Sequence, residues 1–319
     1  MRPPFSITPK TLHLVSQIER LIGRVEGLAQ PKPKPHLCKS NRVKTVHGSL
    51  AIEGNTLGLD QITALLNGKR VLGKKEEIRE VLNANDVYDQ ILTYNELDPK
   101  DLLKAHGKMM CSLMDDAGKW RAANVGILKG SKVSHMAPKA DRVPLLMEDL
   151  FGFLKQDETH PLIRGCVFHY ELEFIHPFQD GNGRIGRFWH SLLLTRYHPV
   201  FEFIPVESLI REHQKAYYQA LETSDQSGNS TAFVEFSLSM IHQALEDFVA
   251  IFKPEPLTAK TRLETAKSHC TDQPFSRKQY LDFFKTISTA TASRDLKLGT
   301  DQKILSKTGE KAVTVYRYL

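Results

Sequence analysis

The sequence predicts a mostly α-helical protein in two parts. Apolar residues recur at the three- and four-residue spacing of amphipathic helices through most of residues 1–252. Strand-like alternation is confined to a short run at residues 125–127 and to the end of the chain. The Lys-Pro-Glu-Pro segment at 253–256 disfavours helix, so it predicts a boundary before a smaller second domain.

Length and composition are those of an ordinary globular protein. The 319 residues suffice for a large core and a second domain, and 41% of them are hydrophobic and 25% charged. The sequence has no long apolar run and no apolar segment near its N-terminus, so we expect a cytoplasmic protein without membrane spans. The four cysteines are scattered, which predicts reduced thiols. The net charge of +6 favours an anionic partner, for which nucleic acid is one candidate.

Two helical patterns open the chain. The first spans residues 1 to about 30, and the proline-rich segment 31–35 then predicts an extended connector. A second helix is predicted from about Asn41 to Glu53, with Gly54 as its C-cap. Glu53 places a negative charge at the negative end of that helix dipole, which local helix physics disfavours. Either Glu53 is a solvated end residue, or it has a cationic partner elsewhere in the fold.

Helical patterns continue through the middle of the chain with one interruption. The predicted helices cover residues 76–95, 101–114, 143–155 and 161–175. Residues 118–141 break this rhythm with a short β-like run and a polar stretch, for which a surface loop is the simplest alternative. His169 and Glu173 lie four residues apart on one predicted helix, but two ligands are too few for a metal site. We therefore interpret them as a packing pair.

The remaining elements are helical up to the final hairpin. Further helices are predicted at residues 188–197, from about 207, at 232–252, and then at 258–267, 276–287 and 290–298. The last residues alternate like two strands around the polar segment 307–311, which predicts a β-hairpin.

Residues 176–187, with the sequence His-Pro-Phe-Gln-Asp-Gly-Asn-Gly-Arg-Ile-Gly-Arg, concentrate the polar chemistry of the chain. Glycines on both sides of Asn182 let backbone N–H groups converge, and the following helix adds its positive N-terminal end. Arg184 and Arg187 share one face of the first helical turn, and the guanidinium fork suits phosphate oxygens. This combination predicts a phosphate-binding site.

Two side chains of the same segment suggest what happens to that phosphate. Asp180 is a hard oxygen ligand that could hold Mg²⁺ against phosphate oxygens. His176 titrates near neutral pH, so it is suited to take a proton from an attacking hydroxyl.

The same segment also fits two other interpretations. Residues 181–186 are a literal G-x-G-x-x-G with Glu202 about twenty residues on, as in dinucleotide-binding folds. That motif needs a preceding strand, whereas residues 162–174 have helical spacing and no succession of βαβ units surrounds them. A plain glycine-rich helix connection is the other alternative, and no Walker A sequence occurs.

Residues 176–187 resemble the signature of the Fic family, H-x-F-x-[DE]-G-N-G-R-x-x-R, at every fixed position. The resemblance implies a helical bundle that transfers AMP from ATP, with Mg²⁺, to a Ser, Thr or Tyr hydroxyl of a protein, itself included. It implies that His176 is the catalytic base, that Asp180 holds the metal and that Phe178 anchors the loop. The implied phosphate-binding residues are Gly181, Asn182, Gly183, Arg184 and Arg187.

A second segment, Ser49 to Gly54, resembles the inhibitory motif [ST]-x-x-x-E-[GN] of one subgroup of Fic proteins. Ser49 and Glu53 lie on one face of the predicted helix. The resemblance implies that Glu53 pairs with Arg187 and removes the cation that should hold the γ-phosphate. ATP would then bind unproductively, and the enzyme would be restrained.

The resemblance also implies a domain division and further site residues. Residues 1–110 form an N-terminal helical region with the inhibitory motif at 49–54, and residues 111–252 form the catalytic core. Within that core, residues 118–141 correspond to a β-hairpin flap that pairs with the target segment. Tyr218 is the candidate for contact with adenine, and a homodimer is plausible.

Residues 257–319 are similar to a winged helix-turn-helix module, with three helices followed by a hairpin. Residues 289–295 look like the start of its recognition helix, which would present Arg294 to a major groove, with Lys307 and Lys311 near phosphate. Such a module binds DNA in some proteins and other proteins in others. Two alternative functions therefore stay open: a DNA-binding regulator whose core senses nucleotide, and an enzyme that removes AMP from a modified protein.

Overall fold

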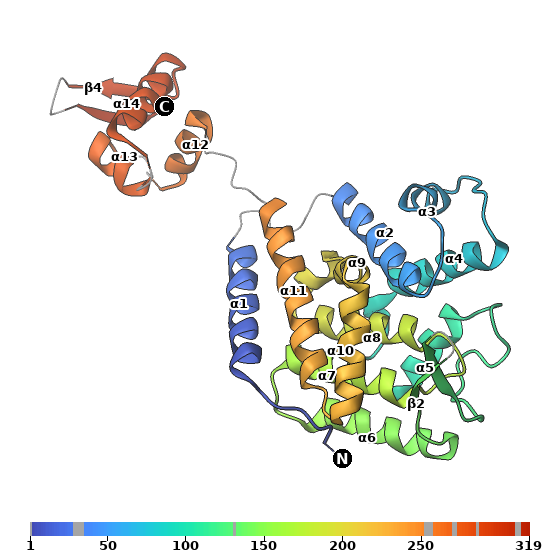
Figure 1. Ribbon diagram of the computed structural model, residues 1–319. Helices are drawn as coiled ribbons and strands as arrows, with labels where there is room; N and C mark the ends of the chain where they lie inside the picture. The colour runs from blue at the N-terminus through green and yellow to red at the C-terminus, as the bar shows by residue number, and fades with distance from the viewer. Residues whose placement is uncertain are drawn as a thin grey trace. The chain divides into compact units, whose positions relative to one another are not determined.

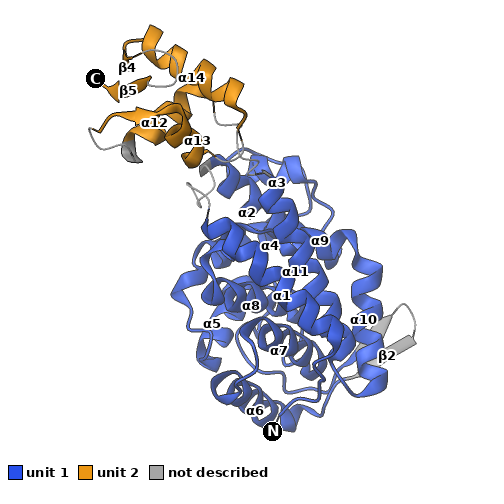
Figure 2. Ribbon diagram, turned by 90° about the vertical axis from the view of Figure 1, so that its left-hand side faces the viewer, with its two compact units in different colours: residues 1–251 blue, residues 252–319 orange. Residues whose placement is uncertain are grey.

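The computed structural model of the chain describes residues 2–27, 35–129, 132–251, 258–269, 273–284, 287–309 and 314–319. Two compact units, residues 1–251 and 252–319, make up the chain (Figure 2). Their division lies next to the predicted boundary at 253–256, whose residues are themselves outside the described set. The mostly helical fold is confirmed.

Unit 1 is a bundle of helices (Figure 1). In chain order its α-helices are α1 (Pro9–Glu26), α2 (Pro35–Ile52), α3 (Leu59–Leu66), α4 (Lys75–Asp89), α5 (Pro99–Met109), α6 (Val143–Gln156), α7 (Pro161–Ile175), α8 (Asn182–Tyr197), α9 (Val206–Glu212), α10 (Gln214–Ser227) and α11 (Thr231–Ile251). Three 3₁₀ turns accompany them, η1 (Ile91–Thr93), η2 (Ala140–Arg142) and η3 (Pro199–Phe203).

Helix α8 lies in the middle of this bundle. Ile185, Phe188, Trp189 and Leu192 are fully buried, and α8 packs against α7, α5 and α2. Because α8 begins directly after the glycine turn of residues 181–183, its buried body fixes the position of that turn in the molecule.

Several predicted boundaries are wrong by a few residues. Helix α2 begins at Pro35 and not near Asn41, because proline is well accommodated in the first turn of a helix. The rest of the predicted connector, residues 31–34, lies outside the described residues. The helix predicted from about residue 207 is two helices, α9 and α10, since His213 leaves the helical region at φ −105° and ψ 28°.

The interruption at residues 118–141 contains a β-hairpin, as the family resemblance implies. Strands β1 (Gly126–Lys129) and β2 (Lys132–Met136) pair antiparallel, with Gly126 opposite Met136 and Lys129 opposite Lys132. The register shifts between Ile127 and Leu128, where the pairing is irregular.

Unit 2 combines three helices with a small antiparallel sheet. Its elements are α12 (Ala259–His269), β3 (Phe275–Ser276), α13 (Arg277–Phe283), α14 (Thr289–Asp301), β4 (Leu305–Thr308) and β5 (Val315–Tyr318). The predicted hairpin is confirmed as β4 and β5, while β3, which pairs with β5, is too short to leave an alternating pattern. Arg262 and Asp295 form a buried ion pair of 2.6 Å inside this unit. Over the described parts of both units, no helix has the length and apolarity to cross a membrane.

Candidate active site

The loop between α7 and α8 is held by two left-handed backbone positions and one side chain. His176 ends α7 with φ 50° and ψ 59°, and Gly181 precedes α8 with φ 80°. The Asn182 amide accepts a hydrogen bond from Phe178 N and donates one to Phe178 O, each of 2.8 Å. Both ends of this buried side chain are therefore used within the loop, so a phosphate contact at Asn182 would come from its backbone N–H.

The loop is anchored in the core through Phe178, as expected. Its ring is fully buried and stacks on His106 of α5 at a centroid distance of 3.6 Å. His106 Nε2 lies 2.9 Å from the carbonyl oxygen of Asp180, and its Nδ1 accepts a hydrogen bond of 2.9 Å from Gly118 N. These contacts suit a neutral imidazole, and burial lowers the pKa of His106 to about 4.

A buried arginine connects the hairpin to the loop. The guanidinium of Arg121 donates to the carbonyl oxygens of His176 at 2.7 Å, Ala123 at 2.9 Å and Pro138 at 2.5 Å. Burial lowers the pKa of Arg121 below its ordinary value. Ala123 and Pro138 flank the hairpin on its two sides. Arg121 therefore holds both ends of the hairpin close to the backbone of His176, the predicted base.

His176 is half-buried at the end of α7. Its Nδ1 lies 3.3 Å from the carbonyl oxygen of Glu173. A proton on Nδ1 satisfies that carbonyl and leaves Nε2 as the basic nitrogen. The arrangement is therefore suited to a general base.

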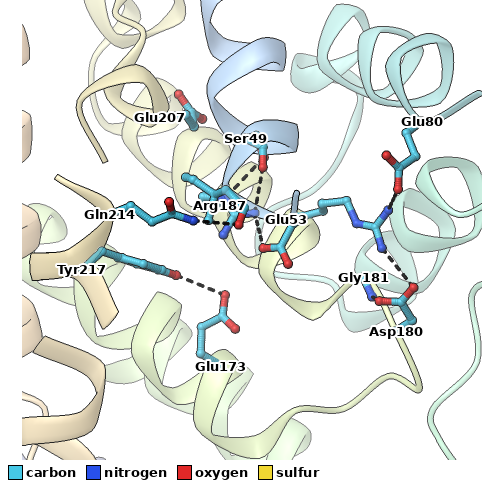
Figure 3. Close-up of polar contacts among 12 residues, drawn as sticks. Ser49, Glu53, Glu80, Glu173, Asp180, Gly181, Arg187, Glu207, Gln214 and Tyr217 are labelled. Carbon is cyan, nitrogen blue, oxygen red and sulfur yellow. Dashed lines mark hydrogen bonds and ion pairs between the residues drawn. The ribbon is translucent and has the colours of Figure 1, made fainter. Parts of the chain in front are cut away.

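The two arginines of the signature are buried and paired with carboxylates (Figure 3). Arg184 contacts Glu80 at 2.6 Å and Asp180 at 3.1 Å. Arg187 Nη2 lies 2.6 Å from Glu53 Oε1 and 3.0 Å from the carbonyl oxygen of Ser49. Burial disfavours the charged form of Arg187, but the neighbouring Glu53 raises its pKa above the ordinary value.

The Glu53 carboxylate also lies against the first turn of α8. A Cβ atom added to Gly183 would collide with Glu53 Oε1 and would come within 3.0 Å of Arg187 Nη1. Only glycine fits here with the carboxylate in place. Glu53 is thus an anion at the N-terminal end of α8, where the helix dipole and backbone N–H groups favour negative charge. Of the two alternatives for Glu53, the structure has the one with a cationic partner.

Neighbouring elements hold the end of α2 in this position. Gln214 Nε2 and the Tyr218 hydroxyl donate to the carbonyl oxygen of Ile52 at 2.9 and 3.3 Å. A Cβ atom on Gly48 would come within 2.7 Å of the Glu207 backbone, so α2 and α9 are in close contact. Tyr217 is buried, with its hydroxyl 3.5 Å from Glu173, whereas Tyr218 is 40% exposed beside Glu53.

Asp180 is the candidate metal ligand of the signature. Its carboxylate is 66% exposed, accepts a hydrogen bond of 2.6 Å from Gly181 N and contacts Arg184. Among the described residues no group of three His, Cys, Asp or Glu side chains could hold a metal alone. One exposed carboxylate beside the predicted phosphate-binding residues nonetheless fits Mg²⁺, which takes one or two protein carboxylates and completes its shell with phosphate oxygens and water.

Several of these residues were missed by the sequence reasoning. Four residues that belong to no local pattern contact the loop, α8 or α2 from 55 to 162 positions away: His106, Arg121, Glu80 and Gln214. The His169 and Glu173 pair lies in the interior at 3.7 Å, beside Tyr217, which agrees with a packing role.

Comparisons with known proteins agree on one family. A family profile described as Fic/DOC matches residues 96–194. The crystal structure of a Fic family protein from Desulfovibrio desulfuricans G20 is 37% identical, covers 100% of this chain and 98% of its own, and superimposes with a TM-score of 0.77. Fic-1 from Caenorhabditis elegans, at 22% identity over 75% of this chain and 72% of its own, has the same fold with a TM-score of 0.62.

Curated relatives of this chain are named protein adenylyltransferases. Protein adenylyltransferase Fic from Culex quinquefasciatus is 27% identical over 242 residues, which are 70% of this chain and 46% of that protein. The corresponding protein from Aedes aegypti is 26% identical over 239 residues, again 70% of this chain and 45% of the relative. The chain thus spans about half the length of the curated relatives that it matches.

Proposed function

The chain belongs to the Fic family, and from this premise we propose that it is a protein adenylyltransferase that transfers AMP from ATP to a protein hydroxyl. The observation that carries the proposal is the loop from α7 to α8. It places a histidine suited to base catalysis next to a helix N-terminus with two buried arginines. Relatives that cover this region are named protein adenylyltransferases, which supports the same activity.

In the proposed reaction His176 Nε2 takes the proton of a Ser, Thr or Tyr hydroxyl as the oxygen attacks the α-phosphorus of ATP. The new phosphorus–oxygen bond forms while the bond to the bridging β-phosphate oxygen breaks, and pyrophosphate leaves. Backbone N–H groups of residues 181–183, with Arg184 and Arg187, hold the phosphates and stabilise the developing charge. Mg²⁺ held by Asp180 would neutralise part of the phosphate charge.

Autoinhibition by Glu53 is part of the proposal. The carboxylate occupies an anion position at the head of α8 and pairs with Arg187, so it competes with the γ-phosphate for both. Tyr218 is the proposed contact for adenine. It is partly exposed next to Glu53, where adenine could stack on its ring.

The test is transfer from α-labelled ATP in the presence of Mg²⁺, with the protein itself and candidate partner proteins as acceptors. The Glu53→Gly protein should become labelled, and the additional substitution His176→Ala should abolish labelling while ATP binding is retained. Equal labelling with and without His176 would reject the role of His176 as the general base. ATP binding without any transfer would favour a nucleotide sensor, and release of AMP from a pre-modified protein would favour the reverse reaction.

Unit 2 supports a second function, binding to nucleic acid. Residues 252–319 contain 13 Lys and Arg against 7 Asp and Glu, a net charge of +6, so the first 251 residues have no net charge. Arg277, Lys278, Arg294 and Lys297 are exposed on α13 and α14, and none of them forms an ion pair in the described parts of unit 2. Helix α14 has no acidic residue in its first turn, and its exposed face begins with small side chains. Exposed Lys and Arg side chains of this kind suit the phosphates of duplex DNA.

This second function is tested with the full chain and a mixed-sequence DNA duplex by fluorescence anisotropy. Affinity should fall with salt, and Arg294→Ala with Lys297→Ala should flatten that dependence by about two phosphate contacts. Lys155→Ala, which removes an exposed cation of unit 1, is the matched control. Binding that is the same in all variants, or that prefers an acidic peptide to the duplex, would reject nucleic acid as the partner of this face.

A further inference from the structure

Glu80 of α4 pairs with Arg184, in addition to Asp180, while Glu53 pairs with Arg187. Glu80 Oε1 lies 2.6 Å from Arg184 Nη1, and Glu80 Oε2 accepts a hydrogen bond of 2.8 Å from the Asn55 amide. Asn55 belongs to the turn that follows Glu53 and also donates to the carbonyl oxygen of Glu77 at 3.1 Å. One carboxylate therefore links Arg184 to the turn behind the inhibitory motif.

The two carboxylates on Arg184 differ in their exposure to solvent. The Asp180 side chain is 66% exposed, the Glu80 side chain 22%, and the arginine itself 7%. The Arg184 Nε atom is buried and makes no hydrogen bond within the described residues. The orientation of the guanidinium therefore depends on these two carboxylates. A phosphate that arrives from solvent can take the place of Asp180 at Nη2, whereas the more buried Glu80 keeps its hold on Nη1.

We infer that Glu80 is a positioning residue, which holds the guanidinium of Arg184 so that Nη2 faces the phosphates of the bound nucleotide. The inference rests on the proposed function, because it assigns Arg184 to nucleotide. The inference gives Glu53 and Glu80 opposite roles. Glu53 pairs with Arg187 and must leave before the phosphate binds, while Glu80 pairs with Arg184 and stays. Removal of Glu53 should strengthen productive ATP binding, and removal of Glu80 should weaken it.

ATP binding and AMP transfer are measured by calorimetric titration with ATP and Mg²⁺ and by steady-state kinetics. Comparing the unsubstituted protein with Glu53→Gly gives the effect of removing Glu53, and the Glu80 substitutions are then made in the Glu53→Gly protein. Glu80→Ala should weaken ATP binding about tenfold, because a charge-assisted contact to Arg184 is lost. Glu80→Gln keeps the size and an acceptor oxygen, so its loss should be smaller. The effect should be on KM for ATP more than on kcat, since His176 is untouched. Glu76→Ala removes an exposed carboxylate from the same helix and should change neither.

A double-mutant cycle with Arg184→Ala separates positioning from a general structural role. If Glu80 acts through Arg184, Glu80→Ala should have no further effect on ATP affinity once Arg184 is absent. Additive losses, or an unchanged affinity in Glu80→Gln and Glu80→Ala alike, would overturn the inference. Weaker ATP binding without AMP transfer in any variant would leave the inference standing and reject the proposed activity.

Discussion

Substitution of Glu53 by glycine tests the arrangement of the site most directly. In the structure Glu53 supplies the closest carboxylate to Arg187, at 2.6 Å, and occupies the space in front of Gly183. The substitution removes both obstacles to a γ-phosphate. It leaves the hydrogen bonds from Arg187 to Ser49 in place, with the backbone contact at 3.0 Å and the hydroxyl contact at 3.3 Å.

The expected size of the effect follows from the contact that is lost. A hydrogen bond to a charged group contributes about 1.5–3 kcal/mol net. Arg187 is 1% exposed, which favours the upper part of that range, whereas Glu53 is 33% exposed, which weakens the pair through solvent screening. ATP has to displace this contact, and about 1.4 kcal/mol corresponds to a factor of ten. We therefore expect the rate of AMP transfer at subsaturating ATP to rise about 10- to 100-fold.

The assay is the initial rate of label transfer from α-labelled ATP, with ATP affinity measured in parallel by titration. Glu53→Gln, which keeps the side-chain volume but removes the charge, should give an intermediate rate. The exposed Glu76→Ala should behave as the unsubstituted protein. A rate that stays flat in Glu53→Gly, although ATP binding becomes tighter, would refute the idea that this carboxylate restrains the chemistry. An unchanged ATP affinity would refute the competition with phosphate.

Two further predictions concern the scaffold of the loop. His106 has a folded pKa of about 4 against an ordinary value near 6.5. As pH falls through 6.5, His106 takes up a proton in the unfolded chain but not in the folded chain. The contribution of His106 to the free energy of unfolding is therefore full above pH 6.5 and falls by up to about 3 kcal/mol toward pH 4. Denaturant titrations across that range, compared with His106→Gln, should show a weaker acid sensitivity in the variant, and identical slopes would contradict the assignment. Arg121→Ala leaves part-buried carbonyl oxygens of His176, Ala123 and Pro138 without this donor and removes a buried guanidinium, so unfolding should become easier by about 3 kcal/mol, as measured in urea. Arg121→Lys should recover only part of this loss because an ammonium lacks the planar fork, and full recovery would argue against the multiple contacts.

The sequence by itself determined the helical class and the residues of the α7–α8 loop on which the proposed chemistry depends. Helical periodicity depends on neighbours within one or two turns, so α6, α7 and the body of α8 could be predicted. The loop is equally local, because its glycine turn, arginines and histidine are all supplied by twelve contiguous residues. The family resemblance implied that Phe178 anchors the loop, and the ring is fully buried.

The tertiary structure decided which residues complete the site. Local physics indicated only that Glu53 was out of place at the end of a helix, and the family resemblance was needed to suggest Arg187, 134 positions away. Nothing in the periodicity identified Glu80, His106 or Arg121, whose partners lie 104, 74 and 55 positions distant. Ion pairs and carbonyl contacts of this kind arise from how helices pack, and packing depends on the shape of the whole core, which one-turn spacing does not encode.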